Sequence, residues 1–139
     1  MIVLDTNVVS ELIRDVPATA VVRWARSVPS AERFLTAVSV GELVYGVSRL
    51  PEGRRRTALE AAVASALASF SPEQFLPFDE AAARPYGSLF AHRERLGRPI
   101  EIADAQIAAI CLHHGAALAT RNPRDFTDLD LRLINPWTA

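Results

Sequence analysis

Four acidic residues, widely separated along the chain, are the side chains best suited to chemistry: Asp5, Glu42, Asp104 and Asp125. Asp5 directly follows an apolar run, and Asp125 follows another such run across a turn. Glu42 and Asp104 lie near the starts of predicted helices. No histidine or cysteine accompanies them, and carboxylate oxygens alone favour Mg²⁺, with Mn²⁺ as a substitute, over zinc. Whether they form one site depends on the elements that carry them.

Short apolar runs alternate with longer helical patterns, which is typical of βα units around a parallel sheet. Strands are predicted near Ile2–Leu4, Phe34–Val38, Phe75–Phe78, Ala117–Thr120 and Leu131–Ile134. Helices are predicted from Asp5 to Arg14 and over Ala18–Ser27, Ser39–Leu50, Arg54–Phe70, Glu80–Leu96 and Glu101–His113. The last helix is apolar almost all round, so we expect it to be buried against the sheet and to end at Gly115. The fold class is therefore α/β, a single three-layer α/β/α sandwich with a mostly parallel four- to five-stranded sheet, in one domain over residues 1–139.

This arrangement predicts that the four acids meet. Ligands of an open parallel sheet bind at the carboxyl ends of its strands. Asp5 and Asp125 follow strands, and Glu42 lies in the first turn of the helix after the second strand. A helix that leads into a parallel strand runs antiparallel to it. Asp104, in the first turn of such a helix, should therefore lie at the same edge.

Each acid also has a structural explanation of its own. Asp5 could cap the first helix, and Ser39 with Glu42 has the spacing of a capping box. Asp104 suits a helix N-terminus, and Asp125 suits a turn. Together these explanations are weaker, because two carboxylates 4 Å apart repel by about 4 kcal/mol at an effective dielectric constant of 20. Such a cluster needs a cation or raised pKa values.

A carboxylate-held Mg²⁺ site open to solvent is suited to phosphodiester hydrolysis, because the ion activates water and neutralises charge in the transition state. The pattern leaves open whether one or two ions bind. The chain contains no lysine, which excludes P-loop, Schiff-base and lysine-assisted aspartyl-phosphate chemistry. A phosphatase or receiver-like domain is disfavoured further, since Thr6 and Asn7, and no second acid, follow Asp5.

The composition indicates an intracellular protein. Cys111 is the single cysteine, so no disulfide can form within the chain, and a reducing compartment fits best. The first residues lack the basic and apolar regions of a secretory signal, and no apolar run is long enough to span a membrane. We expect a cytoplasmic location.

Several segments of the chain match one known family. They are Leu4-Asp5-Thr6-Asn7, Ser39-Val40-Gly41-Glu42-Leu43 with Gly46, Gly97-Arg98-Pro99-Ile100, Asp104-Ala105-Gln106-Ile107-Ala108-Ala109, Thr120-Arg121-Asn122-Pro123-Arg124-Asp125-Phe126 and Ile134-Asn135-Pro136-Trp137. In this order the chain resembles the PIN-domain family, and within it the VapC toxins of bacterial toxin–antitoxin pairs, especially their FitB-like branch.

The resemblance implies a magnesium-dependent endoribonuclease, the toxin component of a type II toxin–antitoxin system, which cleaves RNA phosphodiesters by metal-activated water. Asp5, Glu42 and Asp104 would be its invariant acids. Asp125 is the candidate for the fourth metal ligand, with Asn122 as the alternative. Thr6 and Thr120 match small hydroxyl positions of the pocket.

The same resemblance implies partners. The family forms homodimers, and a VapB-like antitoxin blocks the acidic groove, often with an arginine; larger assemblies with the antitoxin are expected. DNA would be contacted only through the antitoxin.

Other residues are open to more than one interpretation. The alternative function is a non-catalytic interaction module whose acidic groove binds a basic antitoxin segment. Arg121 is the best candidate for a phosphate contact. The arginines at 54–56 and at 93, 95 and 98 are interpreted as solvated residues that pair with nearby glutamates. The histidines at 92, 113 and 114 are predicted to be structural.

Overall fold

A central parallel sheet positions every other element of the chain. The computed structural model describes residues 1–139. Its strands are β1 (Ile2–Leu4), β2 (Arg33–Thr36), β3 (Phe75–Leu76), β4 (Ala117–Ala119) and β5 (Leu133–Ile134), in the order β3-β2-β1-β4-β5. All four pairings are parallel. The predicted α/β class is therefore confirmed, and the sheet has five strands.

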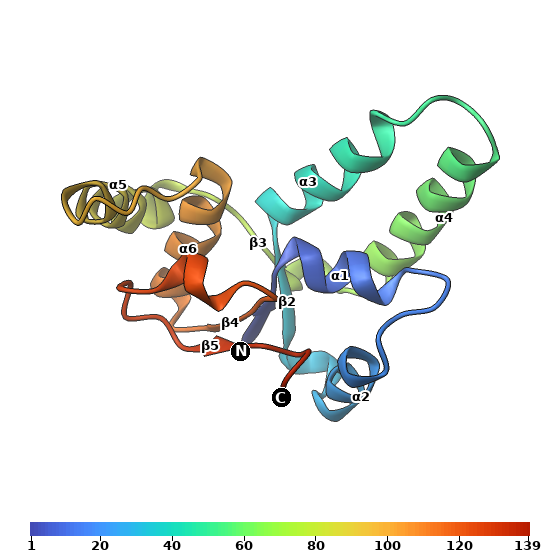
Figure 1. The fold of residues 1–139 in the computed structure, drawn as a ribbon, viewed down its shortest axis with the longest axis horizontal. Helices are drawn as coiled ribbons and strands as arrows, with labels where there is room; N and C mark the ends of the chain where they lie inside the picture. Colours follow the sequence, from blue (N-terminus) through green and yellow to red (C-terminus); the bar gives the residue numbers. More distant parts are fainter.

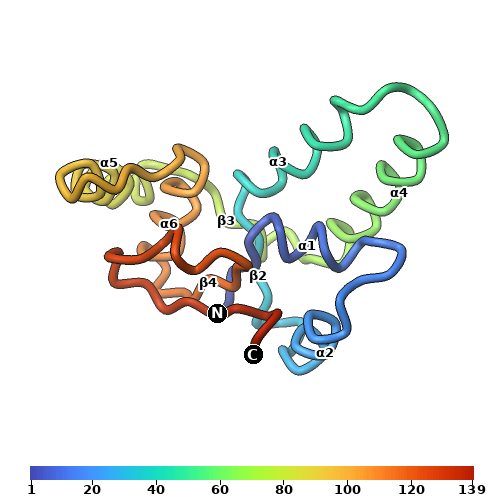
Figure 2. The backbone as a smooth tube through the Cα atoms, in the orientation of Figure 1, coloured from blue at the N-terminus to red at the C-terminus, as the bar shows by residue number.

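Six α-helices flank the sheet (Figures 1 and 2). They are α1 (Thr6–Leu12), α2 (Thr19–Ser27), α3 (Ala37–Ser48), α4 (Arg54–Ala68), α5 (Glu80–Arg95) and α6 (Ile102–His114). Three short 3₁₀ helices complete the structure: η1 (Ser30–Glu32), η2 (Pro72–Gln74) and η3 (Pro123–Phe126). None of the helices has the length and the apolar composition needed to cross a lipid bilayer.

Alternation along the strands creates two separate cores. Val3 and Leu118 belong to the core that contains α5 and α6, whereas Leu4 and Ala119 belong to the core shared by α1, α2, α3 and α4. Successive strand residues point to opposite faces, so each strand contributes to both cores. Figure 1 shows the result, with α5 and α6 on one side of the sheet and the other four helices on the opposite side.

Helix α6 is the most deeply buried helix, as its apolar sequence predicts. Residues 107–111 are all 0 % exposed. Gly115 ends the helix with a left-handed backbone (φ 63°), which glycine adopts without strain. The prediction of burial is wrong for one residue of this helix: Ile102, the first residue of α6, is 59 % exposed. A first-turn residue extends beyond the sheet edge and has less to pack against.

The junction between β2 and α3 differs from the prediction. The strand ends at Thr36, two residues earlier than expected, and α3 begins at Ala37. The Thr36 hydroxyl oxygen accepts the Ser39 N–H at 3.0 Å and so caps the helix. The capping box predicted for Ser39 and Glu42 is therefore wrong, and Glu42 lies in the second turn. The β-branched residues of this segment suggested a longer strand, but a local side-chain hydrogen bond decides where the helix begins.

We predict that α6 tolerates truncation at its first turn but not in its centre. Ile107→Ala should lower the free energy of unfolding by about 2–5 kcal/mol, because it leaves a cavity in a fully buried site. Ile102→Ala removes the same atoms from an exposed site of the same helix and should cost less than about 1 kcal/mol. Urea unfolding of both variants, followed by circular dichroism, measures the difference. Equal losses would contradict the described burial.

Candidate active site

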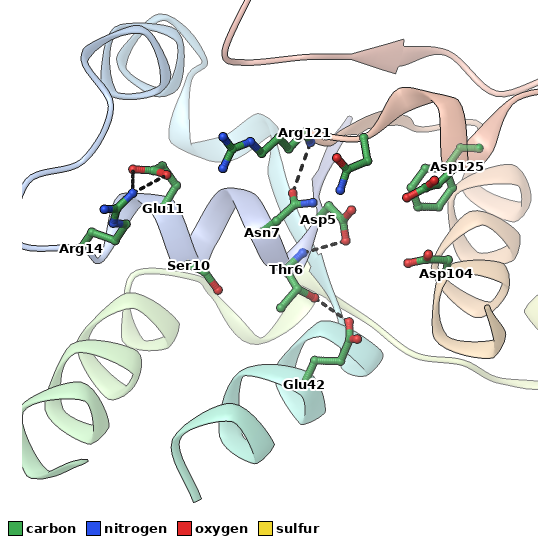
Figure 3. Close-up of a pocket in the computed structure, with 12 residues that line it drawn as sticks. Asp5, Thr6, Asn7, Ser10, Glu11, Arg14, Glu42, Asp104, Arg121 and Asp125 are labelled. Atoms are coloured by element: carbon green, nitrogen blue, oxygen red, sulfur yellow. Dashed lines mark hydrogen bonds and ion pairs between the residues drawn. The ribbon is translucent and has the colours of Figure 1, made fainter. Parts of the chain in front are cut away.

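A polar pocket lies at the carboxyl ends of β1 and β4, where α1, α3 and α6 begin (Figure 3). Its volume is about 600 Å³. Twelve residues line it: Asp5, Thr6, Asn7, Ser10, Glu11, Arg14, Glu42, Asp104, Arg121, Asn122, Asp125 and Phe126. Phe126 is the one hydrophobic residue among them. All four predicted acids are therefore brought to one pocket, and so are Asn122 and Arg121, whereas no histidine lines it.

Asp5 is hydrogen-bonded through both of its carboxylate oxygens and is only 5 % exposed. One carboxylate oxygen accepts the N–H of Thr6 at 2.8 Å, and the other accepts the hydroxyl of Thr120 at 2.8 Å. The Asp5 backbone N–H donates to the carbonyl of Ala119 at 2.9 Å. Burial raises the pKa of Asp5, the charges of Glu42 and Asp125 raise it further, and the two hydrogen bonds offset part of the increase. Both oxygens are thus fixed in direction between β1 and β4.

Glu42 is oriented by a chain of hydroxyl groups, although its own side chain is exposed. The Thr6 hydroxyl donates to a Glu42 carboxylate oxygen at 2.7 Å and lies 3.0 Å from the Ser39 hydroxyl. The Ser39 hydroxyl in turn lies 3.3 Å from that of Thr36. Each hydroxyl has a single proton, so with Thr6 donating to Glu42, Ser39 must donate to Thr6. The cap of α3 is therefore coupled to the pocket.

Asp104 carries the clearest electrostatic perturbation. It lies in the first turn of α6, as predicted, and is half-buried. Burial and then the charges of Asp5, Asp125, Glu42 and Glu101 raise its pKa from 3.8 to about 7. No side chain of the protein donates a hydrogen bond to it. Asp104 is thus a carboxylate close to several others with no compensating partner.

Asp125 lies in η3, opposite Asp104, and its side chain is exposed (Figure 3). Its position depends on Arg93, which we expected to be solvated and which is in fact 4 % exposed. The Arg93 guanidinium donates to the carbonyls of Arg98, Asp125 and Thr127 at 2.7, 2.9 and 3.2 Å. The sequence contained a signal for this burial, since Arg93 lies one helical turn after the buried Leu89. The earlier interpretation of Arg93 was wrong.

The other expected ion pairs are partly found. Arg56 pairs with Glu60 at 2.7 Å, as predicted for a solvated helix face, whereas Arg98 pairs with Asp128 at 2.7 Å and not with a glutamate. None of these four residues lines the pocket.

The opposite end of the pocket contains residues that the sequence did not single out. Glu11 is 5 % exposed, accepts the N–H of Ala18 at 2.9 Å and pairs with Arg14 at 3.2 Å. The hydrogen bond from Ala18, followed by the contact with Arg14, lowers the pKa of Glu11. Asn7 accepts the backbone N–H of Arg121 at 3.3 Å. The spacing of Glu11 and Arg14 is that of an ordinary helical ion pair, so it gave no sign of the pocket.

The carboxylate oxygens of Asp5, Glu42, Asp104 and Asp125 are ligands suited to a divalent cation. These four side chains face one open space, and burial, followed by the neighbouring carboxylate charges, raises the pKa of Asp104 to about 7. As the side chains stand, no three acidic groups are arranged to enclose an ion. Glu42 is turned toward Thr6, and both Glu42 and Asp125 are exposed enough to change rotamer.

Comparison with known proteins identifies relatives along the whole chain. The model of the PIN domain family matches residues 2–131. The VapC ribonuclease Y4jK of Sinorhizobium fredii is 42 % identical over 99 % of this chain and 98 % of its own. Toxin FitB of Neisseria gonorrhoeae is 35 % identical over 99 % of both chains. The crystal structure of FitAcB from Neisseria gonorrhoeae superposes with a TM-score of 0.92 at 36 % identity and covers 100 % of both chains.

These matches agree with the fold of the chain and with the resemblance that its motifs indicated. The chain has a five-stranded parallel sheet with acids gathered at its carboxyl edge, and the family model matches it over nearly its full length. The chain therefore belongs to the PIN-domain family.

Proposed function

We propose that residues 1–139 form one PIN-like nuclease domain that acts as a magnesium-dependent endoribonuclease, the toxin of a type II toxin–antitoxin pair. Asp5, Glu42, Asp104 and Asp125 would hold the metal and form the catalytic centre. The observation that carries the proposal is the convergence of these four carboxylates on one open pocket, where none of them forms an ion pair within the protein. Similarity to VapC ribonuclease Y4jK supports cleavage of RNA, and similarity to Toxin FitB supports the role of a toxin.

Mg²⁺ is the ion that the donor atoms favour, since all candidate ligands are hard oxygens, and Mn²⁺ would substitute. When bound, the ion supplies positive charge that stabilises the phosphodiester transition state and lowers the pKa of water. Asn122 also lines the pocket and is the alternative to Asp125 as the fourth ligand.

The chain's own residues fix the donors in place. Thr6 and Thr120 hold the two oxygens of Asp5, and the Thr6 hydroxyl directs Glu42. Arg93 holds the carbonyl of Asp125 and so fixes η3 against α5. Preorganisation of this kind keeps the cost of assembling the centre low when substrate binds.

A partner that neutralises the acidic pocket follows from the same electrostatics. A guanidinium forms short, bidentate hydrogen bonds with carboxylates, so an antitoxin segment bearing arginine is suited to fill the pocket and block it. A VapB-like antitoxin would also supply the contacts with DNA. Val44 and Tyr45 of α3 are 48 % and 65 % exposed and are candidates for the homodimer surface. A cytoplasmic location would place the toxin with its RNA substrate.

We predict metal-dependent cleavage of RNA that requires Asp5. The purified chain, free of antitoxin, should cut total cellular RNA into discrete fragments in Mg²⁺, and chelator should abolish the cutting. Asp5→Asn should lower the rate by at least about 100-fold, because it removes a charged ligand while keeping the shape of the side chain. Gel analysis of the RNA measures this.

Asp130→Asn is the matched control, since Asp130 is exposed and lies outside the pocket. It should cut RNA like the original chain. Uncut RNA with folded protein and bound Mg²⁺ would favour the interaction module instead. Cleavage that persists in Asp5→Asn would mean that the catalytic assignment is wrong.

We also predict that Asp104 destabilises the metal-free protein at alkaline pH. Its pKa is about 7 in the folded state against 3.8 in the reference state, so the folded state favours the protonated form. The ionised Asp104 side chain lowers the free energy of unfolding by its full amount above pH 7. The effect shrinks as the pH falls from 7 to 4, and it vanishes below that. In chelator at pH 8, Asp104→Asn should raise the melting temperature by a few degrees, and at pH 4 it should have little effect.

Thermal unfolding at both pH values measures this difference, with Asp130→Asn as control. Mg²⁺ should raise the melting temperature of the original chain more than that of Asp104→Asn, since a ligand that binds the folded state stabilises it. A melting temperature of Asp104→Asn that is unchanged or lower at pH 8 would contradict the described repulsion.

A further inference from the structure

The pocket has two ends of different charge, and the proposed chemistry uses only one of them. Asp104 and Asp125 lie at the acidic end, whereas Glu11 and Arg14 lie at the other, with Asp5 between them (Figure 3). The guanidinium of Arg121 extends along the pocket toward this second end. Two guanidinium groups against one carboxylate leave one net positive charge there.

Arg121 is held in place without using its hydrogen-bond donors. Its guanidinium lies 5.0 Å from the centre of the Trp137 ring, within the range of a cation–π contact. Its backbone N–H donates to Asn7 at 3.3 Å, and its carbonyl accepts Asn135 at 3.5 Å. The guanidinium itself makes no hydrogen bond or ion pair within the protein. Its five N–H donors therefore remain available to a ligand.

The C-terminal segment Asn135–Trp137 builds the support for Arg121. The Asn135 side-chain oxygen accepts the backbone N–H of Trp137 at 3.0 Å, and Pro136 is fully buried. The Trp137 ring is half-buried against the core of α1–α4. The proposed metal centre needs none of these residues. The Arg121 guanidinium lies over the Trp137 ring and forms no ion pair with the carboxylates of the same pocket.

Arg14 adds a second guanidinium, and one of its nitrogens is held by an ion pair. It pairs with Glu11, whose own charge is stabilised by the N–H of Ala18. Arg14 itself is 64 % exposed, so the part of its fork not facing Glu11 is open to solvent. The guanidinium groups of Arg14 and Arg121 both lie toward the end of the pocket that contains Glu11 (Figure 3).

We propose that Arg121, supported by Trp137, and Arg14 form a phosphate-binding subsite for an RNA phosphate next to the one that is cut. The inference rests on the proposed ribonuclease function. A guanidinium fork matches the geometry of phosphate oxygens, and its planar face is free to stack on an aromatic ring at the same time. An RNA chain crossing a pocket with five carboxylates needs such a contact, and the subsite places the chain along α1.

The test is binding of a labelled single-stranded RNA oligonucleotide in chelator, where no cleavage occurs, measured by fluorescence anisotropy at several salt concentrations. Arg121→Ala should weaken binding about three- to tenfold and reduce the slope of log K against log salt by about 0.7–1, the effect of one lost phosphate contact. Arg14→Ala should have a similar but smaller effect.

Arg124→Ala is the matched control. Arg124 belongs to the same loop, is exposed, and does not line the pocket, so its removal should change RNA affinity less than twofold. Trp137→Ala should weaken binding as Arg121→Ala does, whereas Trp137→Phe, which keeps an aromatic face, should retain most of the affinity. Combining Arg121→Ala with Trp137→Ala should cause no further loss, because both act through one contact.

Cleavage of RNA in Mg²⁺ is followed in parallel for each variant. Intact cleavage together with equal RNA binding by Arg121→Ala and Arg124→Ala would overturn the subsite and leave the nuclease in place; Arg121 would then serve a protein partner. If the original chain neither binds nor cleaves RNA, the proposed function and the subsite are overturned together. Additive losses in the double variant would show that Trp137 does not act through Arg121.

Discussion

Mutual repulsion of carboxylates at the carboxyl edge of a parallel sheet is the constraint that shapes this molecule. Asp5 is buried there, and four further acids share its pocket, three of them (Glu42, Asp104 and Asp125) on the side of the proposed metal centre and the fourth, Glu11, at the other end. Burial and like charge both oppose ionisation, and the pKa of Asp104, raised to about 7, records the outcome. Such an arrangement costs stability, and hydrogen bonds to neighbouring residues position the Asp5 and Glu42 carboxylates and the backbone of Asp125. In the proposed function, the divalent ion offsets this cost.

The surrounding structure fixes the acids through small polar contacts and one buried cation. Thr120 directly follows β4, and its hydroxyl donates to Asp5, while Thr6 connects Asp5 to Glu42 between α1 and α3. Arg93 lies almost wholly inside the protein and donates only to carbonyl groups. A buried guanidinium without a carboxylate partner is costly unless its donors are satisfied. Here they hold η3, which carries Asp125.

The same pocket extends beyond the acids to a basic end built on α1 and the C-terminal segment. This polarity gives the pocket a direction along which a polyanion would lie. A polyanion and a cluster of carboxylates repel each other, so affinity has to come from elsewhere than the acidic centre. A metal ion at one end and guanidinium groups at the other are two physically distinct sources of that affinity, and they can be separated by experiment.

The sequence by itself determined the class of fold, the order of the elements and the gathering of the four acids, because hydrophobic periodicity and the rule for parallel sheets depend on local pattern and topology. Tertiary structure decided what depends on contacts between distant segments. The burial of Arg93 is set by the carbonyls of Asp125 and Thr127, more than thirty residues away, and the exposure of Ile102 by the edge of the sheet. The basic end of the pocket was likewise hidden, since Arg121 and Trp137 meet only when the chain folds. A pattern of residue types predicts which side chains face inward, but only the folded structure shows which of them form hydrogen bonds or other contacts with distant residues.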